Sequence, residues 1–399
     1  MLQFIKTNKR LLNFGFLFNF FSSFGQTFFI SIFVPYWIIS FELNKASFGY
    51  LYTALTLTSA LLLSVFGRYV DRLAIRTFAA IVFSALLVAV VSLSFAQTFF
   101  HFALSLFFVR WLGQGLMTHT ANTGIARHFS SERGRALGLT LLGHPAGQFA
   151  LPIIIVWLID IHGWRNSLHY AVLGASVIVI PALFMLRKTS AHMPVTRSGE
   201  KLSKSRKRDL FLSPTFWIIG VNMAFIPLFS TALFLYQFVL AETRGWSASQ
   251  VAFSFIFYSV AGAISMVSAG PLVDRYSARF FFPLYLAPLF IALILLGFIQ
   301  AWVVLPFFYA VLGFVTGFGS TLKGALLAEI YGTAELGRIR GFFSTVMVFS
   351  TALGPPVLGY ALDREIPFLF IALFFAVLTI VVIALSSALR VPEPRNDRA

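Results

Sequence analysis

The sequence predicts an all-α membrane protein with twelve transmembrane helices in two six-helix pseudo-repeats. The chain is 58% hydrophobic and only 11% charged, with a mean hydropathy of +0.85. Soluble domains are about 45–50% apolar and about 25% charged. The motif Gly67-Arg-Tyr-Val-Asp71-Arg72-Leu-Ala-Ile-Arg76 returns 203 residues later as Gly270-Pro-Leu-Val-Asp274-Arg275-Tyr-Ser-Ala-Arg279. An internal repeat of this length in an apolar chain indicates a duplicated membrane protein.

The same offset keeps other residues in register. These pairs are Asn19 and Asn222, Arg135 and Arg338, Gly138 and Gly341, Pro152 and Pro355, and Asp160 and Asp363. A transmembrane helix needs about 20 predominantly apolar residues. The predicted spans are residues 11–40, 46–66, 77–95, 99–121, 136–159, 164–186, 214–241, 251–270, 280–298, 302–327, 341–362 and 367–389. The predicted organisation is an N-terminal half (1–186), a basic linker (187–213), a C-terminal half (214–391) and a tail (392–399).

The formal net charge of +16 sits in alternate connections between the apolar runs. No basic face carries interleaved aromatic residues, so we expect no nucleic-acid partner. The positive-inside bias instead predicts that both termini and the linker are cytoplasmic, in a bacterial inner (plasma) membrane. The first run is longer than the apolar region of a signal peptide, so we expect an uncleaved span. The absence of cysteine excludes disulfides and thiolate metal sites.

The six-plus-six pattern, the basic middle segment and the repeated loop motif together resemble the major facilitator superfamily over essentially the whole chain. Ala74 stands where the family pattern normally has glycine. The resemblance implies a cytoplasmic latch, for which glycine permits close approach and a carboxylate can accept N–H groups at a neighbouring helix start. The predicted gating residues are Gly67, Asp71, Arg72, Arg76, Gly270, Asp274, Arg275 and Arg279.

The fourth run contains Arg110-Trp-Leu-Gly113-Gln114-Gly115, which resembles the arginine motif of the family's fourth helix. Arg110 lies about ten residues into this span, near the middle of the membrane. A charge there costs at least ~2.5–3.5 kcal/mol unless it is paired or hydrated. All fourteen acidic residues lie in predicted loops, tails or helix ends, and Lys323 is a second intramembrane cation. This pattern predicts a site for an anion. In the alternative reading, Arg110 bonds to carbonyls and Gln114, while Lys323 snorkels to the cytoplasm.

Further polar residues fall on the first, fourth, seventh and tenth runs, the helices that line the central cavity in this superfamily. The predicted substrate-binding set is Arg110, Gln114, Lys323, Asn19, Gln26 and Asn222. His119 and His144 are candidates for carrying a coupling proton, because histidine titrates near neutrality. The alternative for each is a hydrogen-bonded packing histidine.

The stretch from Phe129 to Pro152, with Gly138, Gly143 and Gly147, resembles the monocarboxylate and oxalate–formate branch. Two departures are a first run without that branch's Gly-Trp-rich acidic signature and an eighth run without a charged residue. The function predicted is transport of a small organic anion, a carboxylate, by alternating access with proton coupling or exchange. The alternatives are proton-driven efflux of a drug or metabolite such as a siderophore, and a non-transporting membrane sensor on the same fold.

The sequence contains no G-x4-G-K-[ST] loop, and no set of nucleophile, base and orienting residue can be assembled from it. We therefore expect no enzymatic activity, no cofactor and no metal. The expected partners are a small anionic substrate and membrane lipids, and the expected functional form is a monomer.

Overall fold

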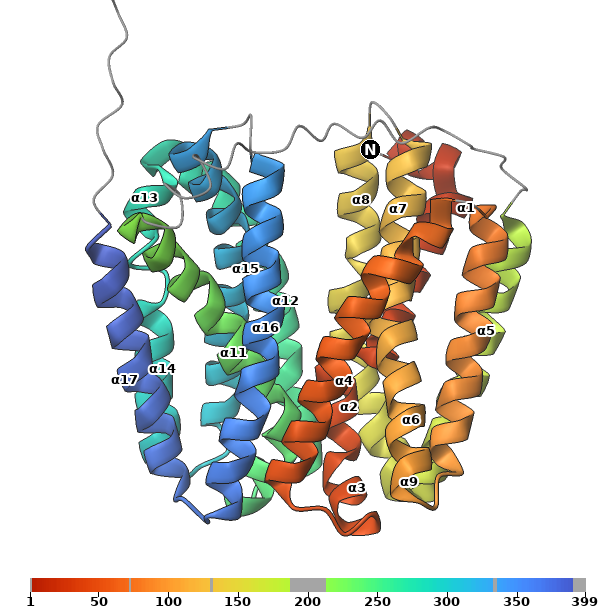
Figure 1. Cartoon of the computed structure of the whole chain (residues 1–399), viewed down its shortest axis with the longest axis horizontal. Helices are drawn as coiled ribbons and strands as arrows, with labels where there is room; N and C mark the ends of the chain where they lie inside the picture. Colours follow the sequence, from red (N-terminus) through yellow and green to blue (C-terminus); the bar gives the residue numbers. More distant parts are fainter. Residues whose placement is uncertain (1, 72, 130–131, 187–212, 333–335, 390–399) are drawn as a thin grey trace, which may run out of the picture. The chain divides into compact units, whose positions relative to one another are not determined.

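The computed structural model of the chain is built from long α-helices joined by short connections (Figure 1). It describes residues 2–71, 73–129, 132–186, 213–332 and 336–389. The predicted tail and all of the predicted linker except Ser213 lie outside the described residues. The division of the chain at the linker therefore stays a prediction.

Apolar runs of membrane-spanning length form the helices, because a helix satisfies its own backbone groups without water. The first part of the chain contains α1 (Leu2–Phe21), η1 (Ser22–Gly25), α2 (Thr27–Ile30), η2 (Ser31–Phe33), α3 (Val34–Ser40), α4 (Lys45–Phe66), η3 (Gly67–Asp71), α5 (Ile75–Ser94), α6 (Phe99–Arg110), η4 (Trp111–Met117), α7 (Thr118–His128), α8 (Arg133–Leu141) and α9 (Gly143–Met185). The second part contains α11 (Pro214–Thr243), α12 (Ala248–Tyr276), α13 (Ala278–Phe281), α14 (Ala287–Phe298), α15 (Val304–Tyr331), α16 (Leu336–Asp363) and α17 (Phe368–Ser387).

Each predicted span has a helical counterpart, which confirms the predicted fold class, and the differences lie at breaks. Among the residues that the structure describes, eight helices are long and apolar enough to span a membrane, or nine if the bent pair that meets near Gln26 counts as one. The long helix α9 covers the fifth and sixth predicted spans, and Gly163 marks the turn inside it with φ of 74°. The fourth span is interrupted by the π-helical segment η4, and α14 is a short helix of 12 residues. These breaks account for the lower count.

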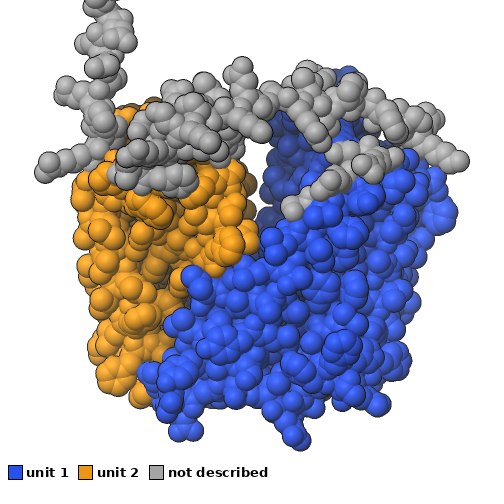
Figure 2. Space-filling model, in the orientation of Figure 1, with its two compact units in different colours: residues 1–195, 231–260, 352–366 blue, residues 196–230, 261–351, 367–399 orange. Residues whose placement is uncertain are grey.

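The chain divides into two compact units, which Figure 2 shows in different colours. Unit 1 contains residues 1–195, 231–260 and 352–366. It therefore combines the first half with the end of α11, the start of α12 and the end of α16. Unit 2 contains residues 196–230, 261–351 and 367–399.

Aromatic side chains fill much of the core of unit 1. Trp37 is 1% exposed, stacks on Phe33 at 5.4 Å between ring centroids and meets the edge of Phe102 at 5.3 Å. Such pairs add stabilisation beyond the area they bury. These contacts attach α3 to the start of α6, the helix that ends at Arg110.

Candidate functional site

The first span breaks at Gln26 and leaves a backbone carbonyl without its usual helical partner. Gln26 is extended, with φ of −82° and ψ of 151°, between η1 and α2. The amide of Phe29 therefore donates to the Gln26 carbonyl at 3.1 Å, not to the carbonyl of Gly25. Helix ends leave such carbonyls free for other donors. The Gly25 oxygen instead accepts a hydrogen bond from Nη1 of Arg110 at 3.2 Å.

Arg110 is the last residue of α6, and its side chain is 2% exposed. Its Nε donates to the hydroxyl of Thr56 at 2.9 Å, and its guanidinium carbon lies 4.2 Å from the ring centroid of Tyr52. Within the described part of the chain, its contacts are a carbonyl, a hydroxyl and an aromatic ring. No carboxylate is among them. The positive charge is thus solvated by dipoles and a ring quadrupole, without a fixed counter-ion.

One face of α4 supplies the polar partners of this arginine. Tyr52, Thr56 and Ser59 follow one another at spacings of four and three residues, and all three are buried. The Tyr52 hydroxyl lies 2.7 Å from the hydroxyl of Thr27 on α2. The Ser59 hydroxyl is buried and has no hydrogen-bond partner among the described residues. The cluster therefore keeps an unused hydroxyl about one turn from the hydroxyl that binds Arg110.

Glycines bring the first and fourth spans into direct backbone contact beside the arginine. A Cβ atom on Gly113 would lie 2.6 Å from the backbone nitrogen of Gly25, closer than packed atoms tolerate. Gly113 lies in η4, and π-helical turns widen the helix and change which residues share a face. Gln114 is exposed and makes no hydrogen bond with Arg110, although α-helical spacing predicts a common face.

Of the two predicted binding residues on the first span, Asn19 lies in the packing between helices. It is 1% exposed, and its amide nitrogen donates to the carbonyls of Gly15 at 2.9 Å and Thr140 at 3.2 Å. It also lies 3.5 Å from the side-chain oxygen of Asn122. Gln26 is half-buried at the helix break itself. Asn19 thus joins α1 to α7 and α8, while Gln26 marks the freed carbonyl.

Unit 2 holds a second polar cluster, around Lys323. Lys323 lies in α15, is 8% exposed, and places its Nζ 5.8 Å from the ring centroid of Tyr285. The Tyr285 hydroxyl donates to Oδ1 of Asn222 at 2.7 Å, and Nδ2 of Asn222 donates to Ser386 at 2.9 Å. No carboxylate contacts Lys323 among the described residues. Asn222 and Lys323, both predicted binding residues, therefore meet the same tyrosine.

The predicted coupling histidines lie in different surroundings. The Nε2 atom of His119 is 3.1 Å from the carbonyl oxygen of Gly67, to which it donates when that nitrogen is protonated. The ring of His144 is half-buried and meets Phe28 edge-on at 6.0 Å. His119 is thus attached to the repeated loop motif, whereas His144 packs on an aromatic ring of α2.

The first copy of the loop motif is held by α7. In addition to the bond from His119, Nη1 of Arg127 donates to the Val70 carbonyl at 2.9 Å. Arg76 reaches the end of α9, where its guanidinium carbon lies 5.5 Å from the Phe184 ring centroid. Arg72 and the side chain of Asp71, two predicted gating groups, lie outside the described part of the structure.

In the second copy of the motif, Arg279 pairs with Glu329 at the end of α15, with 3.7 Å between Nε and Oε2. Glu329 also accepts the backbone amide of Ala278 at 2.8 Å, at the start of α13. Asp274 and Arg275 are exposed, and a Cβ atom on Gly270 would meet nothing within 4 Å. Glu329 thus accepts a backbone amide at a helix start, which is the role that the latch hypothesis gives to a carboxylate such as Asp71.

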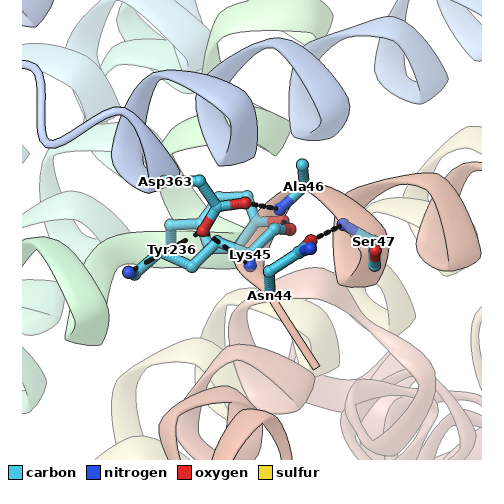
Figure 3. A network of polar contacts seen from close by, with 6 residues as sticks. All are labelled: Asn44, Lys45, Ala46, Ser47, Tyr236 and Asp363. Atoms are coloured by element: carbon cyan, nitrogen blue, oxygen red, sulfur yellow. Dashed lines mark hydrogen bonds and ion pairs between the residues drawn. The ribbon is translucent and has the colours of Figure 1, made fainter. Parts of the chain in front are cut away.

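A carboxylate also binds the start of α4, as Figure 3 shows. The two oxygens of Asp363 accept the backbone amides of Lys45 at 2.9 Å and Ala46 at 2.7 Å. Nζ of Lys45 lies 3.9 Å from the same carboxylate, and the Tyr236 hydroxyl donates to the Lys45 carbonyl at 2.6 Å. Asn44 caps the helix by accepting the amide of Ser47. Within unit 1, residues of the second half therefore hold the first turn of α4.

Sequence reasoning missed Tyr52, Thr56, Tyr236, Tyr285 and the role of Asp363. A signal for the α4 residues was present, because Tyr52, Thr56 and Ser59 repeat at helical spacing in an apolar run. Asp363 was noted only as the repeat partner of Asp160. A helix-end carboxylate gives no sequence sign of which helix start it binds.

A model of the Major Facilitator Superfamily matches residues 15–241 and again residues 222–399. Monocarboxylate transporter 13 of Bos taurus is 26% identical over 278 residues, which are 68% of this chain and 63% of that protein. Enterobactin exporter EntS of Escherichia coli O1:K1 / APEC is 25% identical over 228 residues, 56% of this chain and 54% of that protein. The chain thus spans less than two thirds of the length of these relatives.

Among solved structures, a bacterial homologue of the human lysosomal transporter Spinster, in an inward-facing and unoccupied conformation, has a similar fold. The TM-score is 0.69 at 15% identity, covering 96% of this chain and 94% of that chain. At this identity, the likeness concerns the fold alone.

Proposed function

The chain belongs to the major facilitator superfamily and is an integral multi-pass membrane protein. On this premise we propose that it is a secondary transporter of a small organic anion. The cargo is a carboxylate, and it moves by alternating access with proton coupling or by exchange. The naming of a relative as a monocarboxylate transporter supports this substrate class. The family offers no catalytic role, so the proposal includes no enzymatic step.

The observation that carries the proposal is the buried guanidinium of Arg110 without a carboxylate partner. Arginine has five N–H donors in a planar fork that matches a carboxylate. Bonds within the described residues use one donor on Nε and one on Nη1. A carboxylate cargo would accept from the remaining donors and neutralise the buried charge. The unbonded Ser59 hydroxyl supplies a further donor for the same cargo.

We assign the remaining predicted binding residues secondary parts in the same proposal. Within unit 2, Lys323 is a second buried positive charge for anion binding, and Asn222 orients Tyr285 beside it. Gln26 and Gln114 offer amides near the helix break and the π segment, and Asn19 holds the surrounding helices in place.

We assign gating to the two copies of the loop motif and to the contact between Asp363 and α4. His119, bonded to the first loop, and His144, packed on Phe28, are both kept as candidates for carrying a coupling proton. The basic loops and the positive-inside rule support cytoplasmic termini, and the membrane we propose is a bacterial inner membrane.

The test is flux into liposomes that contain the purified protein. We expect saturable uptake of radiolabelled carboxylates, competition between carboxylates, and loss of uptake in Arg110→Ala. Uptake with and without an imposed pH gradient separates proton coupling from exchange. Uptake of neutral compounds that carboxylates do not inhibit would contradict the anion proposal.

A second candidate function is export of a metabolite such as a siderophore, which the similarity to an enterobactin exporter favours. Inside-out vesicles would then accumulate a catecholate siderophore and leave monocarboxylates outside. A protein that binds either ligand, measured by a thermal shift, but moves neither would instead support a non-transporting sensor.

A further inference from the structure

A groove lies beside the N-terminal part of α1, at the end of unit 1 that carries the basic loops. Its volume is about 580 Å³, within the range of about 300–1,000 Å³ that holds small ligands. The lining comes from three helices, α1, α8 and α9. The lining residues are Ile5, Lys9, Arg10, Leu12, Asn13, Phe16, Leu139, Ala182 and Met185.

Polar and apolar groups are separated along the groove. Lys9, Arg10 and Asn13 are exposed on adjacent turns of α1. Phe16 follows Lys9 by two turns, so it lies about 10 Å further along the helix, toward the middle of the span. Leu139 and Ala182 line the groove from the neighbouring helices. One end of the groove is therefore cationic, and its floor is apolar.

The charges on the groove favour an anion and disfavour the chain itself as the occupant. No acidic residue lines the groove among the described residues. The segment 187–213, which follows α9 directly in sequence, carries eight Lys or Arg against two acidic residues. Like charges disfavour its docking on Lys9 and Arg10.

The groove also borders a surface that faces lipid. Val177, Phe184 and Met185 on α9 are 66%, 71% and 58% exposed. In a multi-pass membrane protein, a run of such exposed apolar side chains contacts acyl chains. Because Met185 belongs both to this surface and to the groove lining, a lipid can reach the groove from the side.

We propose that this groove binds an anionic phospholipid. The headgroup phosphate contacts Lys9 and Arg10, Asn13 donates its amide, and one acyl chain lies along Phe16 and Leu139. Basic pockets between transmembrane helices select anionic headgroups, and each Lys or Arg near the surface contributes about fivefold in affinity.

The test is native mass spectrometry of the full chain released from nanodiscs that contain equal amounts of phosphatidylglycerol and phosphatidylcholine. We expect phosphatidylglycerol adducts to exceed phosphatidylcholine adducts clearly. Lys9→Gln and Arg10→Gln should each reduce this preference about fivefold. Lys6→Gln removes the same charge one turn away, outside the groove, and should leave the preference unchanged.

Two further arms address the source of the anion and the apolar floor. Inorganic phosphate at millimolar concentration should not compete with phosphatidylglycerol, because it has no acyl chain for the groove. Ala182→Phe fills the floor without changing charge and should remove the adducts. Equal loss in Lys6→Gln, or full competition by phosphate, would overturn the proposal. If Ala182→Phe fails to fold, the three charge variants still decide the outcome.

Discussion

The two copies of the repeat differ at the position where the first copy holds its buried cation. Gly313 in α15 stands 203 residues after Arg110, at the equivalent position. A Cβ on Gly317, one turn further along α15, would clash with the carbonyl of Gly262 on α12. In the second copy, small residues thus pack two helices closely. In the first copy, the equivalent helices are separated by a guanidinium and its hydroxyl partner.

The first and seventh spans differ in the same way. Gly25 at the break of the first span corresponds to Leu228, which lies inside the unbroken helix α11. Pro227 lies inside α11 and has no N–H to donate to the Met223 carbonyl, yet the helix continues through this position without a break. The comparison teaches that, within the described residues, the first span breaks and binds Arg110 through the carbonyl freed there, whereas the equivalent α11 continues as one helix.

The largest expected effect concerns Arg110. Arg110→Ala should lower kcat/KM for uptake about 100-fold, because it removes charged hydrogen bonds. Arg110→Lys should recover little, since an ammonium lacks the planar fork. Arg135→Ala is the matched control, because this exposed arginine pairs with Glu132 and lies over the ring of Phe4, away from Arg110 in the sequence. If Arg110→Ala takes up substrate within twofold of the wild-type rate, the first copy does not bind the substrate through Arg110.

Gly113 tests the close contact beside the arginine. Gly113→Ala should cost about 1–3 kcal/mol of stability by overpacking against Gly25, and it should lower the midpoint of thermal unfolding in detergent. Gly174→Ala is the control, because a Cβ there meets nothing within 4 Å. If both variants unfold at the wild-type temperature, the two spans are not in backbone contact at Gly113.

Lys323 tests whether the second copy also contributes a charge. Lys323→Gln should raise KM for the anion about tenfold with kcat nearly unchanged, because one unpaired charge is lost. Lys323→Arg should keep most of the affinity. An unchanged KM in Lys323→Gln would favour the reading in which this lysine snorkels to the aqueous boundary.

A substitution at Asp363 tests the contact between the two halves of the sequence within unit 1. Its expected effect is the smallest of the four. Asp363→Asn should weaken the binding of this side chain to the first turn of α4 by about 0.5–1 kcal/mol, because a neutral amide oxygen accepts more weakly than a carboxylate from the backbone amides of the helix start. Thr53, whose hydroxyl donates to the Ala352 carbonyl, reports on the same region. The chain has no cysteine, so Thr53→Cys gives a single thiol, which should react faster with a polar reagent in the Asp363→Asn background.

The control for this experiment comes from the repeat. Asp160 is the equivalent of Asp363 and is exposed. Asp160→Asn should leave the reactivity of the thiol unchanged. An equal increase in both backgrounds would show that general charge loss, not the helix contact, controls access.

Predictions from the sequence succeeded where the signal was local. Arg110 was expected to be deep in the bundle and to bond carbonyls in the alternative reading, and it is buried against the Gly25 carbonyl. Its partners Thr56 and Gly25 lie 54 and 85 positions away, so spacing could not identify them. Gln114 was placed on the face of Arg110 by α-helical periodicity, which the π-helical segment η4 does not follow.

The sequence by itself determined that this chain is a helical membrane protein built from a repeat, and it predicted two intramembrane cations with every acidic residue in a loop, a tail or a helix end. Hydropathy decides this, because hydrocarbon admits only segments that satisfy their own backbone. The tertiary structure alone decided which groups surround those cations, and that His119 and Asp363 hold a loop and a helix start. Such bonds join residues distant in the chain, and they depend on where a helix breaks and which carbonyl the break leaves free.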